Sequence, residues 1–295
     1  MAANSIVEEP DGAAAAREDL PGRLHGMWAA VAGGWAEHAE YVDSRGAEVT
    51  ERMLELTAPR TGERVLELAC GPGSVGLAAA ARVGDSGTVV VSDVAAEMTD
   101  IAVRRAAALG LANVTGRALD IERIDEPDAS YDVVLCREGL MFAVDPARGA
   151  GEIARVLRPG GRAAVAVWGR REHNPWLGVV LDSVSAQLGR PVPPPGIPGP
   201  FSLADADRLT ALLIDAGLSD VTVIEMPVPL RAASFEQWWE RTCALAGPLT
   251  QILASLPADA AEGLRACARQ AVRSYETTDG LHLPGLTLLA SGRRD

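Results

Sequence analysis

Short β-rich segments alternate with helical segments between residues 62 and 168. The clearest predicted strands are 64–69, 88–92, 131–136 and 162–168. A helix between two strands lets the chain cross over and enter the sheet again in the same direction, so the pattern predicts βαβ units and a mostly parallel sheet. An all-helical fold and an all-β fold are both excluded.

The most informative turn follows the first of these strands. Gly71-x-Gly73-x-x-Gly76 lies between the strand and an alanine-rich helix, and Asp93 ends the next strand. This arrangement satisfies the fingerprint of dinucleotide-binding proteins, so an NAD(P)-dependent oxidoreductase is one interpretation.

Two observations count against a nicotinamide cofactor. Glu67 precedes the turn, where its carboxylate would repel a pyrophosphate at the helix N-terminus and favour a cationic ligand. In addition, all 27 basic residues are arginine. Without lysine the chain has no Tyr/Lys hydride-transfer pair, and it cannot form a Schiff base with a cofactor or substrate.

The same stretch resembles a different family. Glu67-x-Ala69-x-Gly71-x-Gly73 is similar to the first motif of class I S-adenosylmethionine-dependent methyltransferases, and the similarity continues in order to about residue 168. The segments that carry it further are Asp93, Leu119-Asp120-Ile121, residues 132–136 and residues 152–161. Trp168-Gly169 and the Pro-Gly-Pro-Phe201 segment place the chain nearest to the methyltransferases related to ubiquinone and menaquinone biosynthesis.

The resemblance implies S-adenosylmethionine as cofactor, S-adenosylhomocysteine as product, and a role for several of these residues. Asp93 would accept hydrogen bonds from both ribose hydroxyls, and Asp120 would meet the adenine amino group. Met98 would cover the adenine or fill the core, and Arg137 would contact the methionyl end or pair with Glu138. The predicted cofactor-binding residues are Trp35, Glu67, Ala69, Gly71, Gly73, Asp93, Val94, Met98, Asp120, Ile121 and Arg137.

Acceptor-binding residues are expected at the carboxyl ends of the strands, where open α/β sheets bind ligands. Met141, Phe142, Trp176 and Trp238 are the candidates for lining an acceptor pocket, and packing is the alternative for each. His173 follows the fifth strand and is the candidate general base, because a neutral imidazole can take a proton from a phenol, enol or acidic carbon. The alternative for His173 is an exposed loop position.

The fold implied by the resemblance is α/β and Rossmann-like. It has a seven-stranded, mostly parallel sheet with helices on both faces, an antiparallel last strand and a helical lid. We expect a disordered acidic tail over residues 1–20 and a methyltransferase domain over 21–295. Its core would comprise about 60–170 and 201–231 with 281–295, and its lid about 21–58, 170–200 and 232–276. The region from Ser234 to Tyr275 is expected to hold two helices divided at Pro257.

The composition of the chain limits which partners it can be expected to bind. Forty acidic residues against 27 arginines give a net charge of −13, which disfavours nucleic acid. The four cysteines form no CxxC pair and no metal site is expected, so we predict a reduced, cytoplasmic chain without a membrane span, as monomer or homodimer. The predicted function is methyl transfer to a small, largely apolar acceptor such as a quinone, a polyketide or another secondary-metabolite-like molecule. The alternatives are the oxidoreductase and a non-catalytic cofactor-binding protein.

Overall fold

A computed structural model describes residues 20–194 and 196–295. The predicted acidic tail, 1–20, lies outside the described residues apart from residue 20. A seven-stranded sheet has the order β3-β2-β1-β4-β5-β10-β6. Its strands are β1 (Arg64–Leu68), β2 (Thr88–Asp93), β3 (Val114–Ala118), β4 (Tyr131–Arg137), β5 (Leu157–Trp168), β6 (Leu218–Pro227) and β10 (Leu286–Arg294).

Strands β1 to β5 are parallel, and β10 runs antiparallel to both β5 and β6. The predicted seven-stranded sheet with an antiparallel last strand is therefore confirmed. Central strands β1 and β4 are buried along almost their whole length, because helices cover both of their faces. The strand order reverses between them, which places the carboxyl ends of β1 and β4 side by side, with Leu68 opposite Cys136. An open α/β sheet forms its ligand crevice at such a switch point.

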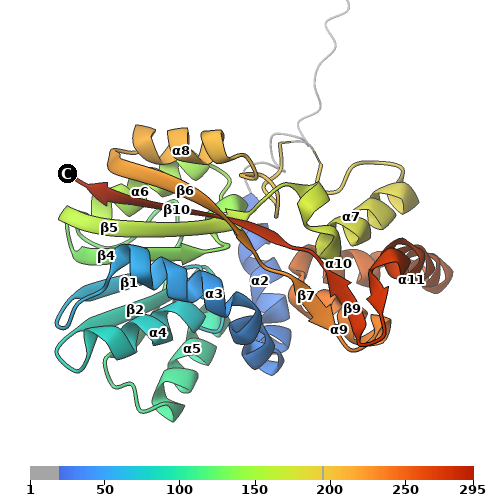
Figure 1. Cartoon of the computed structure of the whole chain (residues 1–295), viewed down its shortest axis with the longest axis horizontal. Helices are drawn as coiled ribbons and strands as arrows, with labels where there is room; N and C mark the ends of the chain where they lie inside the picture. Colours follow the sequence, from blue (N-terminus) through green and yellow to red (C-terminus); the bar gives the residue numbers. More distant parts are fainter. Residues whose placement is uncertain (1–19, 195) are drawn as a thin grey trace, which may run out of the picture.

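Helices pack on both faces of this sheet, as predicted. On one face lie α3 (Ala39–Thr57), α4 (Ser74–Val83) and α5 (Ala96–Ala108), and on the other lie α6 (Pro146–Val156) and α8 (Ala206–Asp215) (Figure 1). Helix α3 falls within the segment assigned to the lid from sequence, but it packs against β5 and β10 instead. Arg162 of β5 anchors the C-terminal end of α3 by donating hydrogen bonds to the carbonyl oxygens of Thr57 and Ala58.

The remaining elements gather beyond one end of the sheet (Figure 1). These are α2 (Leu20–Glu37), α7 (Pro175–Leu188), α9 (Phe235–Leu245), α10 (Gly247–Ser255), α11 (Ala258–Val272), the 3₁₀ turns Leu140–Phe142, Arg171–His173 and Arg273–Tyr275, and strands β7 (Leu230–Ala232), β8 (Glu276–Thr277) and β9 (Gly280–Leu283). A second apolar core holds most of them together around Trp238 and Leu264. We call α2, α7, α9, α10, α11 and the small sheet the lid.

Two features of the lid differ from the sequence prediction. Three helices, not two, lie between Ser234 and Tyr275, because Gly247-Pro248 interrupts the first and the proline suits the opening turn of α10. The three-stranded antiparallel sheet β7-β9-β8 was not predicted, and it includes Leu281, Leu283 and His282, which were assigned to the core. None of the helices in the described part of the chain is long and apolar enough to cross a bilayer.

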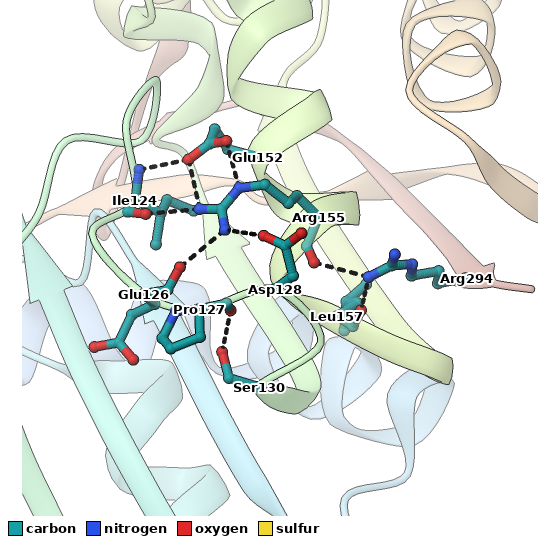
Figure 2. A network of polar contacts seen from close by, with 9 residues as sticks. All are labelled: Ile124, Glu126, Pro127, Asp128, Ser130, Glu152, Arg155, Leu157 and Arg294. Atoms are coloured by element: carbon teal, nitrogen blue, oxygen red, sulfur yellow. Dashed lines mark hydrogen bonds and ion pairs between the residues drawn. The ribbon is translucent and has the colours of Figure 1, made fainter.

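The loop that follows β3 carries Asp120 and is held in place by Arg155 of α6 (Figure 2). The guanidinium of Arg155 donates to the carbonyl oxygens of Ile124 and Glu126 and to the carboxylates of Glu152 and Asp128. Glu152 in turn accepts from the backbone N–H of Ile124 at 2.7 Å. The side chains of α6 therefore hold in place a loop that contains neither helix nor strand.

Candidate functional site

The turn after β1 depends on residues in the left-handed region of backbone space. Ala69, Gly71 and Gly73 have φ of 51°, 51° and 89°. A Cβ at Gly73 would lie 2.7 Å from the Cβ of Ala102, so the glycine allows the turn to pack on α5. Ala69 is a strained position for a non-glycine residue, and such strain is typical of functional sites.

Glu67 binds the N-terminus of α4. Its carboxylate is 2% exposed and accepts backbone hydrogen bonds from Val75 at 3.2 Å and Gly76 at 2.9 Å. Burial raises the pKa of Glu67 to about 7, although these bonds and Arg137 oppose the shift. The carboxylate thus satisfies helix N–H groups that would otherwise be unpaired, and its effect on a cationic ligand stays a prediction.

Gly76 provides the space that the carboxylate of Glu67 occupies at this helix N-terminus. A Cβ there would lie 2.5 Å from Oε2 of Glu67, so the third glycine of the motif makes room for a carboxylate of the protein itself. In dinucleotide-binding proteins the same helix N-terminus receives a pyrophosphate. Here that anion site is already filled by Glu67.

Asp93 ends β2 beside this turn. Its Oδ2 accepts from the backbone N–H of Gly71 at 3.0 Å and its Oδ1 from that of Ala95 at 3.1 Å. Burial raises the pKa of Asp93, while these hydrogen bonds oppose the shift. The carboxylate thus connects the turn to the start of α5.

A first cavity opens between this turn, the loop after β3 and helix α2. It is lined by ten of the predicted cofactor-binding residues, namely Trp35, Glu67, Ala69, Gly71, Asp93, Val94, Met98, Asp120, Ile121 and Arg137. Gly73 is the exception, since it shapes the turn from behind. Met98 both lines the cavity and packs in an apolar cluster with Val31 and Ala95, so it does fill the core, and its contact with adenine stays a prediction.

A second, larger cavity of about 660 Å³ lies between the sheet and the lid. The two cavities share Leu24, Trp28, Trp35, Arg137, Glu138 and Phe142 as wall residues. Apart from a few charged and polar groups, the second cavity is lined by aliphatic, aromatic and proline side chains. It is therefore an apolar chamber that adjoins the first cavity at the carboxyl end of β4 and along α2.

Known proteins share both the sequence motifs and this fold. The methyltransferase domain family matches residues 65–161. Nocamycin O-methyltransferase of Saccharothrix syringae is 33% identical over 66% of this chain and 74% of its own length. The chain belongs to the class I S-adenosylmethionine-dependent methyltransferases.

Two further comparisons agree with this assignment. A ubiquinone/menaquinone biosynthesis C-methyltransferase of Ectopseudomonas mendocina is 31% identical over 59% of this chain and 72% of its own length. The YcgJ protein of Bacillus subtilis shares the fold, with a TM-score of 0.58 and 20% identity over 84% of this chain and 98% of that one. The predicted enzyme class and its S-adenosylmethionine cofactor are confirmed.

The methyltransferase brings only some of the other predicted residues to the cavities. Met141, Phe142 and Trp176 line the second cavity. Trp238 does not: it is 0% exposed and supports the wall from behind, where its Nε1 donates to the carbonyl oxygen of Trp176. His173 is exposed in the turn Arg171–His173 and lines neither cavity, because Asn174 and Pro175 turn the chain inward only after it.

Glu138, which directly follows the fourth strand and was named from sequence as a possible partner of Arg137, is a wall residue of both cavities. It follows β4 with φ of 62°, and burial raises the pKa of its carboxyl group against the opposing charges of Arg137 and Arg45. Arg137 instead donates to Thr50 at 2.7 Å and to Gly46 on α3, and among the described residues it forms no ion pair with Glu138. The place of Glu138 at the end of a central strand was the available signal.

Proposed function

We propose that the methyltransferase transfers the methyl group of S-adenosylmethionine, held in the first cavity, to a small, largely apolar organic acceptor held in the second. The observation that carries this proposal is the shared wall of the two cavities, which brings a donor in one against an acceptor in the other. A volume of about 660 Å³ suits an organic molecule of one or more rings. The similarity to a nocamycin O-methyltransferase and a ubiquinone/menaquinone biosynthesis C-methyltransferase supports an acceptor of this size.

The residues of the first cavity suit the proposed cofactor. An ionised carboxylate has about four acceptor positions, and Asp93 uses two of them on backbone N–H groups. The others remain for the two ribose hydroxyls. Oδ1 of Asp120 accepts from the backbone of Glu122, which leaves Oδ2 for the adenine amino group. Gly71 has no side chain to fill the space in front of Trp35. In this proposal Glu67 acts indirectly, by holding the turn.

The cofactor supplies a methyl group that its sulfonium already activates, so the protein has mainly to position the acceptor and exclude water. Aligning two reactants in this way contributes as much as ~7–11 kcal/mol to lowering a barrier. Helix α2 supplies Trp28 and Trp35 as apolar walls, and the Nε1 of Trp35 donates to Leu245 of α9 at 3.1 Å. We assign Glu138 as the group that receives a proton when the acceptor must lose one, because its raised pKa makes it a stronger base than an exposed glutamate.

Calorimetric titration with S-adenosylmethionine and S-adenosylhomocysteine tests the donor site. Wild-type protein should bind both, and Asp93→Ala should lose about 1–3 kcal/mol of binding free energy with its charge-assisted hydrogen bonds. Asp100→Ala, an exposed acid on α5, is the matched control and should bind as wild type does. Absence of binding by wild-type protein would refute the proposal, and unchanged affinity in Asp93→Ala would remove the ribose role.

A further inference from the structure

The second cavity is positively charged although the whole chain carries −13. Its charged wall residues are Arg45, Arg137, Arg190 and Arg241, against a single carboxylate, Glu138. None of the four arginines forms an ion pair with an acid of the described residues, whereas many arginines elsewhere do. An apolar wall lowers the local dielectric, so this surplus acts on a ligand more strongly than surface charges would.

Arg45 is the least satisfied of these side chains. Its guanidinium carbon lies 4.0 Å from the ring centroid of Trp176 and 5.0 Å from that of Trp168. Its Nε and Nη2 are buried and make no hydrogen bond of normal geometry within the described residues, although the side chain of Tyr41 interacts with the same guanidinium. Leaving buried donors of a charged group unpaired is costly, so such atoms indicate a missing partner.

The geometry of the guanidinium specifies that partner. Nε and Nη2 are the two donors on one edge of the planar group, and this edge matches the two oxygens of a carboxylate. The two tryptophan rings lie within cation–π distance of the guanidinium but offer its edge no hydrogen-bond acceptor. The hydroxyl of Tyr41 interacts with this guanidinium and is likewise buried without a hydrogen bond of normal geometry in the described part of the chain, and the guanidinium carbon of Arg241 lies 4.3 Å from the centroid of the Tyr41 ring.

We infer that the methyl acceptor is an aromatic or polycyclic carboxylic acid, whose carboxylate binds the Nε/Nη2 edge of Arg45 beside Tyr41 while its rings fill the apolar part of the second cavity. This inference rests on the proposed function, since it names the acceptor class for that site. A cationic amine would be repelled by the four arginines. A neutral acceptor would leave the edge of Arg45 unpaired.

Anthracene-2-carboxylate and anthracene-2-carboxamide are suitable probes, because they have the same shape and differ in charge. Their dissociation constants would be measured by fluorescence titration at saturating S-adenosylhomocysteine, which keeps the probes out of the first cavity. The proteins are wild type, Arg45→Met and Arg52→Met. Arg52 lies on the same helix, is partly exposed and pairs with Glu55, so it controls for loss of a positive charge.

Wild type and Arg52→Met should bind the carboxylate more tightly than the carboxamide. Arg45→Met should weaken carboxylate binding about 10- to 100-fold and change carboxamide binding less than about twofold. Equal affinities of wild type for the two probes, or equal losses for both in Arg45→Met, would overturn the inference. Calorimetric binding of S-adenosylhomocysteine by each variant separates this outcome from failure of the proposed function, which would appear as no binding by wild type.

Discussion

Replacing Gly76 by alanine should destabilise the methyltransferase, even though alanine normally favours a helix. The new Cβ would lie 2.5 Å from Oε2 of Glu67 and 2.6 Å from Cγ1 of Val91. Real Cβ atoms essentially never come so close to another atom, so one of the neighbours must move. Val91 is fully buried in β2, and Glu67 can move only by giving up its hydrogen bonds to α4.

The expected cost follows from these two contacts. Hydrogen bonds to a charged group contribute about 1.5–3 kcal/mol. Crowding a well-packed site costs a further ~1–3 kcal/mol. The intrinsic preference of a helix for alanine over glycine returns about 1 kcal/mol. We therefore expect Gly76→Ala to lower the free energy of unfolding by about 2–5 kcal/mol.

Gly151→Ala is the matched control. Gly151 lies inside α6, where an added Cβ would meet nothing within 4 Å, so this substitution should be neutral or stabilising by up to ~1 kcal/mol. Urea-induced unfolding followed by circular dichroism would compare the two variants with wild type. Calorimetry should also show weaker S-adenosylhomocysteine binding in Gly76→Ala alone. If Gly76→Ala proved as stable as Gly151→Ala, the assignment of this glycine to Glu67 would be refuted.

Three further predictions concern buried and networked charges. The pKa of Glu67 is about 7 in the fold against 4.5 in the unfolded chain, so the unfolded chain ionises first and the free energy of unfolding should fall, by about 3 kcal/mol, as the pH rises from ~4.5 to 7. Glu67→Gln should lack this part of the pH dependence in urea titrations from pH 4 to 8, and an unchanged profile would contradict it. Arg155→Ala should weaken S-adenosylhomocysteine binding in calorimetry by freeing the loop that carries Asp120, whereas the exposed Arg148→Ala should not. Arg162→Ala should lower the free energy of unfolding by about 2–3 kcal/mol in urea, since it removes hydrogen bonds to the end of α3 and to Glu63, and wild-type stability would exclude that anchoring role.

Local signals were sufficient for the sheet and for most of the first cavity. Strands β1 and β4 are short segments rich in apolar residues and bounded by turns. Such segments can be recognised in a sequence wherever both faces of a strand are buried. The acid Asp93 and the segment Asp120-Ile121 follow strands directly, so parallel topology alone brings them to one edge. Gly71 was recognisable because a left-handed turn requires glycine or a strained substitute.

The direction in which a side chain points could not be predicted from the sequence in the same way. Glu67 stands next to a ligand crevice and next to a helix N-terminus, and only the path of α4 decides which of the two receives its carboxylate. His173 and Trp176 are three residues apart, yet the first is exposed and the second lines the second cavity. Trp238 is similar in type to Trp176 but is enclosed by the lid core.

The sequence by itself determined the alternation of strands and helices, because periodicity is local, and it predicted the enzyme class, the cofactor and the seven-stranded sheet through motifs that resemble those of a known family and whose members lie near one another along the chain. Only the tertiary structure decided what the second cavity can hold. Its walls come from α2, α3, α7, α9 and α10 and from the ends of β4 and β5, which are far apart in sequence. The unpaired edge of Arg45 arises where these elements meet, since hydrogen-bond satisfaction is a property of packing and leaves no periodic trace in the chain.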